Sequence, residues 1–100
     1  MNMQSLMAQA QKMQRDITKK KEEIDKMNFE GKSELVDVVI NGKKEIVSIS
    51  IQKDASLDSD DLEVLEDMIK IAMNDALKKV DATVDKELGS YGGGALGGLF

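Results

Sequence analysis

The stretch from Asp60 to Leu88 constrains the fold of this chain more than any other segment. At 100° per residue its apolar side chains fall on one broad arc, which predicts an amphipathic helix; they are Leu62, Leu65, Ile69, Ala72, Met73, Ala76, Leu77, Val80 and Val84. Such a helix is about 43 Å long, whereas a compact domain of this size has a radius of gyration of about 13 Å. We therefore expect one end to project, or to be held by a second copy.

The same helix carries a second apolar patch in its N-terminal half. Val64 and Ile71 point roughly opposite to Leu62, and Met68 lies between the two faces. One apolar partner cannot bury both faces, so a second surface must cover the patch. We therefore predict a dimer interface that includes Val64, Met68 and Ile71.

A second helix is predicted over residues 3–27, where apolar residues recur in heptads. The seam consists of Met3, Leu6, Ala10, Met13, Ile17, Ile24 and Met27, with Met7 beside it and Lys20 interrupting it. The chain contains no proline, so nothing breaks the long helices. The seam is too short and imperfect for a coiled coil that is stable alone.

Between the helices the apolar period changes to two, which indicates β-strands over the region 28–53. Val36, Val38 and Ile40 alternate with polar residues, and so do Val47, Ile49 and Ile51. Asn41-Gly42 separates the two runs and predicts a hairpin turn, because both residue types tolerate positive φ. A third strand is expected near Asn28–Ser33. Three further apolar residues are expected on the other face, where a partner subunit would cover them: Leu35, Val39 and Ile46.

These elements predict an α+β fold with a small antiparallel sheet between two long helices, forming one domain over residues 1–88. Six of the residues from Gly89 to the C-terminus are glycine, and glycine loses much backbone entropy on ordering. We therefore expect residues 89–100 to form a flexible tail.

The composition argues against catalysis. Histidine and cysteine are absent, which removes the commonest general base and the best nucleophile, and no apolar pocket is implied. We predict no enzyme activity, no cofactor and no metal site. The acids at 58, 60 and 61 lack the spacing of an EF-hand calcium loop, and helix capping explains them better. We expect Asp58, Ser59 or Asp60 to cap the following helix, and Asp60 with Glu63 has capping-box spacing.

The N-terminal segment has no apolar run of signal-peptide length, and no segment is apolar enough to span a bilayer. We therefore expect a cytoplasmic protein without a membrane partner. The net charge is −5, from 14 basic and 19 acidic residues, which argues against tight, indiscriminate binding to polyanions. The bases are nevertheless concentrated: Lys12, Lys19 and Lys26 repeat every seven residues and Arg15 lies beside them. Such a row contacts phosphates, although Glu22 and Glu23 interrupt it and a solvated surface is the simpler interpretation.

Four segments together resemble the YbaB/EbfC family of bacterial nucleoid-associated proteins over essentially the whole chain. They are LMAQAQKMQRDI (Leu6 to Ile17), VVINGKKEIVSISI (Val38 to Ile51), LEDMIKIAMNDALKKV (Leu65 to Val80) and the Gly-rich end closing in GGLF. The resemblance implies a tweezer-like homodimer located in the nucleoid. It also implies binding of double-stranded DNA with little sequence dependence, and an influence on gene expression.

Carried over to this chain, the resemblance places DNA-binding residues on both helices. On the first they are Lys12, Arg15, Lys19, Lys20 and Lys26; on the projecting end of the second they are Lys78, Lys79 and Lys86. Two alternatives remain open from the residues alone. One is a dimeric adaptor that binds an unknown protein partner and not DNA, and the other is a purely structural oligomer.

Overall fold

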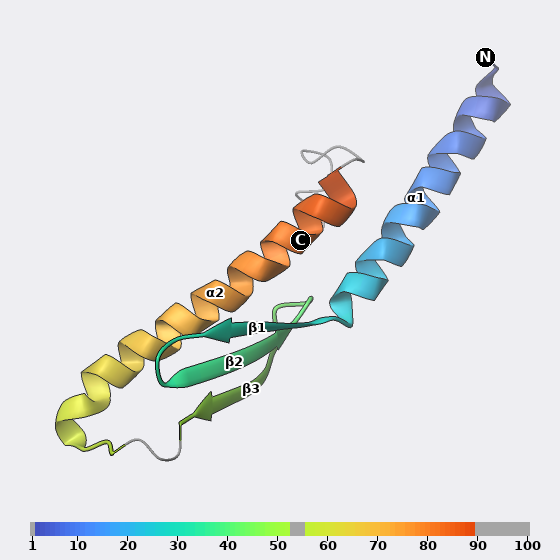
Figure 1. Ribbon diagram of the computed structural model, residues 1–100. Coiled ribbons are helices and arrows are strands. Elements are labelled where there is room, and N and C mark those ends of the chain that lie inside the picture. The colour runs from blue at the N-terminus through green and yellow to red at the C-terminus, as the bar shows by residue number, and fades with distance from the viewer. Residues whose placement is uncertain (1, 53–55, 90–100) are drawn as a thin grey trace.

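The structure is a computed structural model that describes residues 2–52 and 56–89. It has the predicted α+β architecture, with a three-stranded antiparallel sheet that packs against the long C-terminal helix and a long N-terminal helix that extends away from the sheet (Figure 1). The elements are α1 (Met3–Asp25), β1 (Asn28–Lys32), β2 (Val36–Asn41), β3 (Ile46–Ile51), the 3-10 helix η1 (Ser59–Asp61) and α2 (Leu62–Leu88). The first helix ends earlier than the predicted residue 27. Residues 90–100 of the predicted tail lie outside the described residues.

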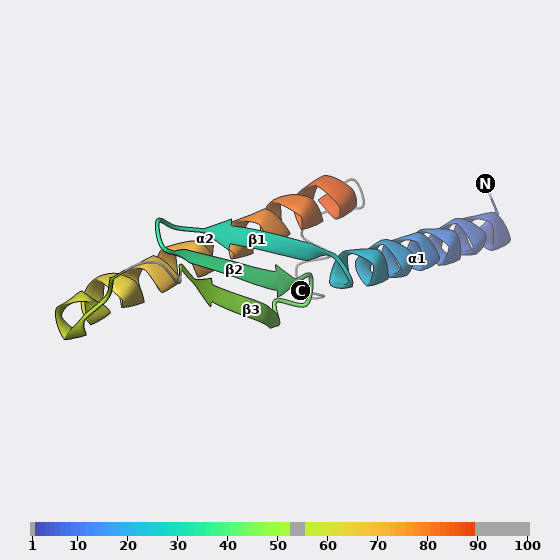
Figure 2. The ribbon, with the colours of Figure 1, turned by 60° about the horizontal axis from the view of Figure 1, so that its bottom comes forward.

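The molecule is elongated. Its radius of gyration is 19.1 Å and its principal extents are 70 × 20 × 16 Å, whereas a compact domain of this length has a radius of gyration of about 13 Å. The cause is α1, which leaves the sheet at its C-terminal end and extends away from it (Figures 1 and 2). The length of the molecule therefore comes from both helices and not from α2 alone.

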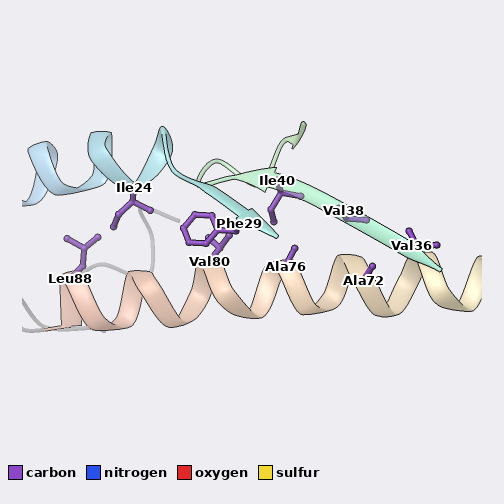
Figure 3. Packing of buried hydrophobic residues seen from close by; sticks show 9 residues of the cluster. All are labelled: Ile24, Phe29, Val36, Val38, Ile40, Ala72, Ala76, Val80 and Leu88. Atoms are coloured by element: carbon purple, nitrogen blue, oxygen red, sulfur yellow. The ribbon is translucent and has the colours of Figure 1, made fainter. Parts of the chain in front are cut away.

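The hydrophobic core lies between one face of α2 and the strands β1 and β2. Ala72, Ala76 and Val80 are buried on α2, and they face buried side chains of the two strands (Figure 3); these are Phe29, Val36, Val38 and Ile40. At the far end, Leu88 packs below Ile24 of α1 (Figure 3). Because alanine side chains are short, they let the backbone of α2 lie close to the backbone of the sheet.

Gly31 lies where the sheet approaches α2 most closely. A Cβ atom built there would overlap the Ala72 carbonyl oxygen and lie 2.6 Å from the backbone nitrogen of Ala76. Both neighbours are helix backbone and cannot move as a side chain can. Gly31 is therefore required by close packing, as glycine within a strand often is.

The third strand extends beyond the cover that α2 provides. Val36, Val38 and Ile40 are buried, but two of their partners on β3 are not: Ile49 is 46% and Ile46 is 51% exposed. Cross-strand partners lie on the same face of a sheet, and Val38 pairs with Ile49. The face of β3 that continues the core is thus open in the single chain.

The register between β2 and β3 contains a bulge that the alternating pattern did not predict. Val39 pairs with Ser48, but Ile40 pairs with Ile46, so Val47 is an extra residue. The prediction that Ile46 belongs with the opposite face is therefore wrong. One inserted residue moves Ile46 to the side of Ile40, because side chains alternate with a period of two.

The hairpin forms where it was predicted, but for a different reason. Among the described non-glycine residues only Lys44 has a positive φ, at 65°, and Gly42 is not in the positive-φ region. Asn41 holds the turn instead, because its side-chain oxygen accepts the amide N–H groups of Lys43 and Glu45 at 2.9 and 3.0 Å. Gly42 is needed for space, since a Cβ there would overlap the Ile24 carbonyl oxygen and lie 2.9 Å from the Cα of Asp25.

At the start of α2 the structure uses Asp58, one of the predicted caps, but not the predicted capping box. Asp58 caps η1: its side chain accepts the N–H of Asp60 at 2.9 Å, and Asp61 accepts the N–H of Asp58 at 3.0 Å. The capping box therefore joins Asp58 and Asp61, not Asp60 and Glu63. The cap therefore lies at Asp58, two residues before Asp60. The 3-10 turn causes this shift, because hydrogen bonds within the turn already satisfy the first backbone N–H groups before α2 begins.

Candidate nucleic-acid interface

The exposed part of α1 carries the most prominent row of bases. We call residues 3–19 the α1 arm. None of its side chains is buried, and Met3 is 76% exposed. Lys12, Arg15 and Lys19 lie on this arm and are all exposed. The Asn2 side chain caps the helix by accepting the Ser5 N–H at 2.8 Å, which holds the arm helical to its end.

Of the three bases in this row, Lys12 is the one that forms an ion pair with an acid of the described residues. Its Nζ lies 3.2 Å from Oδ2 of Asp16, and the lysine side chain is 73% exposed. An exposed pair of this kind contributes little to stability, so the lysine remains available to another anion. Within the described part of the chain, Arg15 and Lys19 take part in no ion pair.

The last turns of α1 are tied to the rest of the fold. Lys20 Nζ lies 3.4 Å from Oε2 of Glu87 on α2, and Lys21 Nζ lies 3.2 Å from Oδ2 of Asp25. Lys26, the C-cap residue, is exposed. Lys20 therefore contributes to the junction between the two helices, whereas Lys19 and Lys26 face solvent.

The bases of α2 do not lie on a freely projecting end. Leu88 is buried against the α1 junction, so the C-terminal half of α2 is held between the sheet and α1. Lys78 and Lys86 are exposed on this half. The expectation that these lysines occupy a free end is wrong, because the sheet packs along the middle of α2 and the last turn of the helix packs against α1.

Lys79 has backbone and side-chain partners. Its Nζ donates to the carbonyl oxygen of Glu30 at 2.7 Å and lies 3.6 Å from Oδ2 of Asp75. Asp75 in turn accepts the backbone N–H of Lys32 at 3.1 Å. Sequence reasoning did not find this contact. The i,i+4 spacing of Asp75 and Lys79 predicts an ion pair on a helix surface but gives no sign of the strand beside it.

The predicted interface residues fall into two groups. Val64 and Ile71 are 51% and 55% exposed, so the single chain leaves them uncovered. Leu35 and Met68 are half-buried against the chain's own core, and Val39 is half-buried on the outer sheet face. Val64 and Ile71 are therefore the two with the most area left to bury.

Two other features do not form a site. The described residues contain no group of three acids placed to hold a metal ion, and Asp58 and Asp61 are used in capping. An open hollow of about 440 Å³ lies between the end of α1 and the hairpin. All but one of the residues that line it are polar or charged, and they include both charges, such as Asp25, Lys26 and Lys43, unlike the pockets lined by apolar side chains that take small molecules.

The comparison with known families is decisive. The YbaB/EbfC DNA-binding family matches residues 1–95. The chain belongs to this family. The predicted resemblance is thus confirmed, and it covers both helices and the sheet.

Relatives that are named nucleoid-associated proteins support the assignment. A nucleoid-associated protein of Streptococcus pyogenes serotype M1 is 43% identical over 95 residues, which cover 93% of this chain and 95% of the relative. One from Streptococcus uberis gives the same identity and coverage. A solved structure, that of the uncharacterized protein HP0035 from Helicobacter pylori, has a TM-score of 0.72 at 23% identity, covering 86% of this chain and 91% of the other; it supports the fold. No helix in residues 2–52 and 56–89 has the length and hydropathy needed to cross a bilayer.

Proposed function

We propose that this YbaB/EbfC-family chain binds double-stranded DNA as a homodimer, with little dependence on sequence, and alters DNA conformation in the nucleoid, thereby influencing gene expression. The observation that carries the proposal is the α1 arm, an exposed helix with three bases in one row. A helix that projects from the core presents these bases to a phosphate backbone without exposing the core.

The chemistry of the arm favours phosphate over base-edge contacts. Lysine and arginine at helical spacing match a repeating line of charges, and phosphate contacts position a protein without reading sequence. The other candidates divide by their surroundings. Lys26, Lys78 and Lys86 are exposed and take part in no ion pair within the described residues, whereas Lys20 and Lys79 have partners. We assign the main contact to Lys12, Arg15 and Lys19.

Dimer formation is supported by the apolar area that one chain leaves open. The uncovered flank of β3 and the patch at Val64 and Ile71 are too apolar to be expected on the surface of a stable monomer. Sedimentation velocity at micromolar concentration tests this step, and the expected result is a mass of two chains. A folded species of one chain would refute the homodimer.

The DNA contact is tested by reversing three charges on the arm. The variant carries glutamate in place of Lys12, Arg15 and Lys19. Its matched control carries glutamate at Lys32, Lys43 and Lys70, which changes the net charge equally but leaves the arm intact. Binding to random and defined duplexes is measured by electrophoretic mobility at several salt concentrations. Each lost phosphate contact should reduce the log–log salt slope by about 0.9.

We expect the arm variant to lose most of its affinity on every duplex while the control loses less. The thermal midpoint should stay near that of the wild type, because none of the three side chains is buried. Equal losses in the two variants would show that only net charge matters, and would refute a contact by the arm.

A second candidate function, a protein adaptor, is favoured by one observation. The α1 arm exposes an apolar stripe of Met3, Leu6, Met7 and Met13, and methionine suits adaptable binding surfaces. Replacing Leu6 and Met13 by serine separates the two functions. Unchanged DNA binding together with loss of a specific protein partner would support the adaptor.

A further inference from the structure

The α1 arm is joined to the rest of the fold through the last two turns of α1. Ile24 is buried and packs on Leu88 at the end of α2 (Figure 3). The hairpin turn lies against the same part of α1, because a Cβ atom at Gly42 would overlap the Ile24 carbonyl oxygen. One turn before Ile24, the Nζ of Lys20 lies 3.4 Å from Oε2 of Glu87. The junction therefore combines a buried apolar contact with an ion pair between the two helices.

The bases of the arm lie far from this junction. Residues 3–15 are all exposed, so no packing against the described part of the chain holds them. At 1.5 Å per residue, Lys12 lies about 18 Å from Ile24 along the helix. A rotation of about 10° at the junction therefore moves Lys12 by about 3 Å, which is as long as a charge-assisted hydrogen bond to a phosphate. Small changes in the direction of the arm thus decide which phosphates its bases can reach.

Lys20 lies on a different side of α1 from the row formed by Lys12, Arg15 and Lys19. At 100° per residue it is about 40° from Ile24, which faces α2, but about 80–140° from the three bases of the row. The ion pair with Glu87 agrees with this placement, since Glu87 belongs to the last turn of α2. Lys20 therefore faces the neighbouring helix, although it stands next to the row in the sequence.

The ion pair gives the junction a direction that its apolar contacts do not. Ile24 and the half-buried Ile17 both pack against the core, but burial of apolar area is favourable without a preferred direction. The ion pair instead favours one separation between Lys20 and Glu87. Because it lies one turn further out than Ile24, it opposes a rotation of the arm about the Ile24 contact.

We propose that Lys20 and Glu87 are positioning residues, whose ion pair fixes the direction of the α1 arm and so holds its three bases in place before DNA arrives. An arm that is already fixed loses less conformational freedom on binding, which strengthens binding without a further contact. The proposal rests on the DNA binding proposed above. It assigns Lys20 to the junction of the two helices rather than to a phosphate.

Removing each partner separately distinguishes positioning from a phosphate contact. Duplex binding is measured by fluorescence anisotropy at one salt concentration. Glu87→Ala removes an acid, so charge alone predicts tighter binding to DNA. Loss of the ion pair predicts the opposite, and we expect the dissociation constant to rise about two- to fivefold, the range of an exposed pair. Equal or tighter binding by Glu87→Ala overturns the proposal.

The double variant completes this comparison. Lys20→Ala should weaken binding at least as much as Glu87→Ala does. Lys20→Ala with Glu87→Ala should bind no more weakly than Lys20→Ala, because both substitutions remove the same interaction. Losses that add up in the double variant would overturn the proposal, since they would show that the two residues act independently.

A matched control and a rescue use the same assay. Asp85 lies two residues before Glu87, is exposed, and forms no ion pair with the described residues. Asp85→Ala changes the net charge equally and should not weaken binding. Lys20→Glu with Glu87→Lys exchanges the two charges at constant net charge, and it should bind within about twofold of the wild type. A loss in this exchanged variant as large as that from Arg15→Ala would instead indicate a phosphate contact by Lys20 and overturn the proposal.

The direction of the arm is measured without DNA, by residual dipolar couplings of the backbone N–H groups. In the wild type the couplings of residues 8–19 and those of α2 should fit one orientation of the molecule. Glu87→Ala should reduce the couplings of residues 8–19 relative to those of α2, whereas Asp85→Ala should not. Couplings of the wild-type arm that are already averaged toward zero, or couplings unchanged in Glu87→Ala, overturn the proposal.

The outcomes separate this inference from the proposed function. A wild type that binds no duplex even at low salt refutes the proposed function, and the positioning for DNA with it. A wild type that binds, together with a Glu87→Ala protein that binds equally or more tightly, refutes the positioning alone. Arg15→Ala gives the reference for a direct contact: it should weaken binding and leave the dipolar couplings of the arm unchanged. A change in those couplings would overturn the distinction between the row and the junction.

Discussion

Replacing Gly31 by alanine tests whether the distance between sheet and helix is set by this residue. The added Cβ would overlap the Ala72 carbonyl oxygen and lie 2.6 and 2.8 Å from the backbone nitrogen and the Cβ of Ala76. Because two of these atoms belong to the helix backbone, α2 must move away from β1 to relieve the overlap. The movement would also lengthen the contacts of Asp75 and Lys79 with β1.

The size of the effect follows from two opposing contributions. Overpacking of a close-packed site costs about 1–3 kcal/mol, while replacing glycine by alanine at a permitted φ stabilises by about 0.4–1 kcal/mol through the unfolded chain. The steric cost is larger, so we expect a net loss of about 1–2 kcal/mol. For a domain of 60–100 residues each kcal/mol lowers the thermal midpoint by about 4–8 °C, which gives a decrease of about 4–16 °C.

Thermal unfolding followed by circular dichroism at a fixed protein concentration measures this change, since assembly makes the midpoint depend on concentration. Gly89→Ala is the matched control. Among the described residues, no heavy atom outside the local helix backbone lies within 4 Å of a Cβ there, and Gly89 has a helical φ of −60°, so its midpoint should stay equal or rise. A Gly31→Ala protein that melts within about 2 °C of the wild type would refute the claim that this glycine sets the approach of α2.

Four further substitutions probe other contacts. Leu88→Ala removes a side chain that is 1% exposed and should cost about 2–5 kcal/mol in urea denaturation at any protein concentration; a loss seen only in dilute protein would contradict its place in the single-chain core. Val64→Ala should leave unfolding of the separate chain unchanged but raise the dimer dissociation constant severalfold in sedimentation, and an unchanged constant would exclude Val64 from the interface. Asp58→Ala should cost about 0.5–2 kcal/mol through the lost cap, and calorimetry with an unaltered midpoint would count against that cap. Gly42→Ala should displace the end of α1 at Ile24 and lower the midpoint, and full retention of the wild-type midpoint would contradict the close packing there.

The features that the sequence predicts correctly depend on local periodicity. The long helix after residue 60 and the heptads of α1 follow from spacings of three and four, and the strands β2 and β3 follow from alternation. Each pattern lies within one element, so no knowledge of the neighbouring element is needed. The buried positions Ala72, Ala76 and Val80 were likewise expected on one face of α2.

The features that were missed depend on contacts between elements. Asn41-Gly42 marks the hairpin, but its conformation is set by the Asn41 side chain and by the contact of Gly42 with α1. The bulge at Val47 interrupts an alternation that looks regular in the sequence. A glycine at position 31 indicates a close approach, yet it does not identify the helix that approaches.

The candidate site shows the same division. The bases of α1 are visible as a seven-residue repeat, and the structure leaves Arg15 and Lys19 exposed. Lys79 belongs to an equally basic stretch, but the structure bonds it to Glu30 on a strand nearly fifty residues earlier in the chain. Charge alone does not distinguish a lysine that faces solvent from one that holds a sheet edge.

The position of the α1 arm outside the core has an evolutionary consequence. Apart from the half-buried Ile17, the arm adds no apolar side chain to the packing around α2, so its surface residues can be exchanged with little change in the free energy of unfolding. Folding therefore places little constraint on the surface residues of the arm. Gly31 has no such freedom, because almost any substitution there would destabilise the fold, whatever its effect on binding.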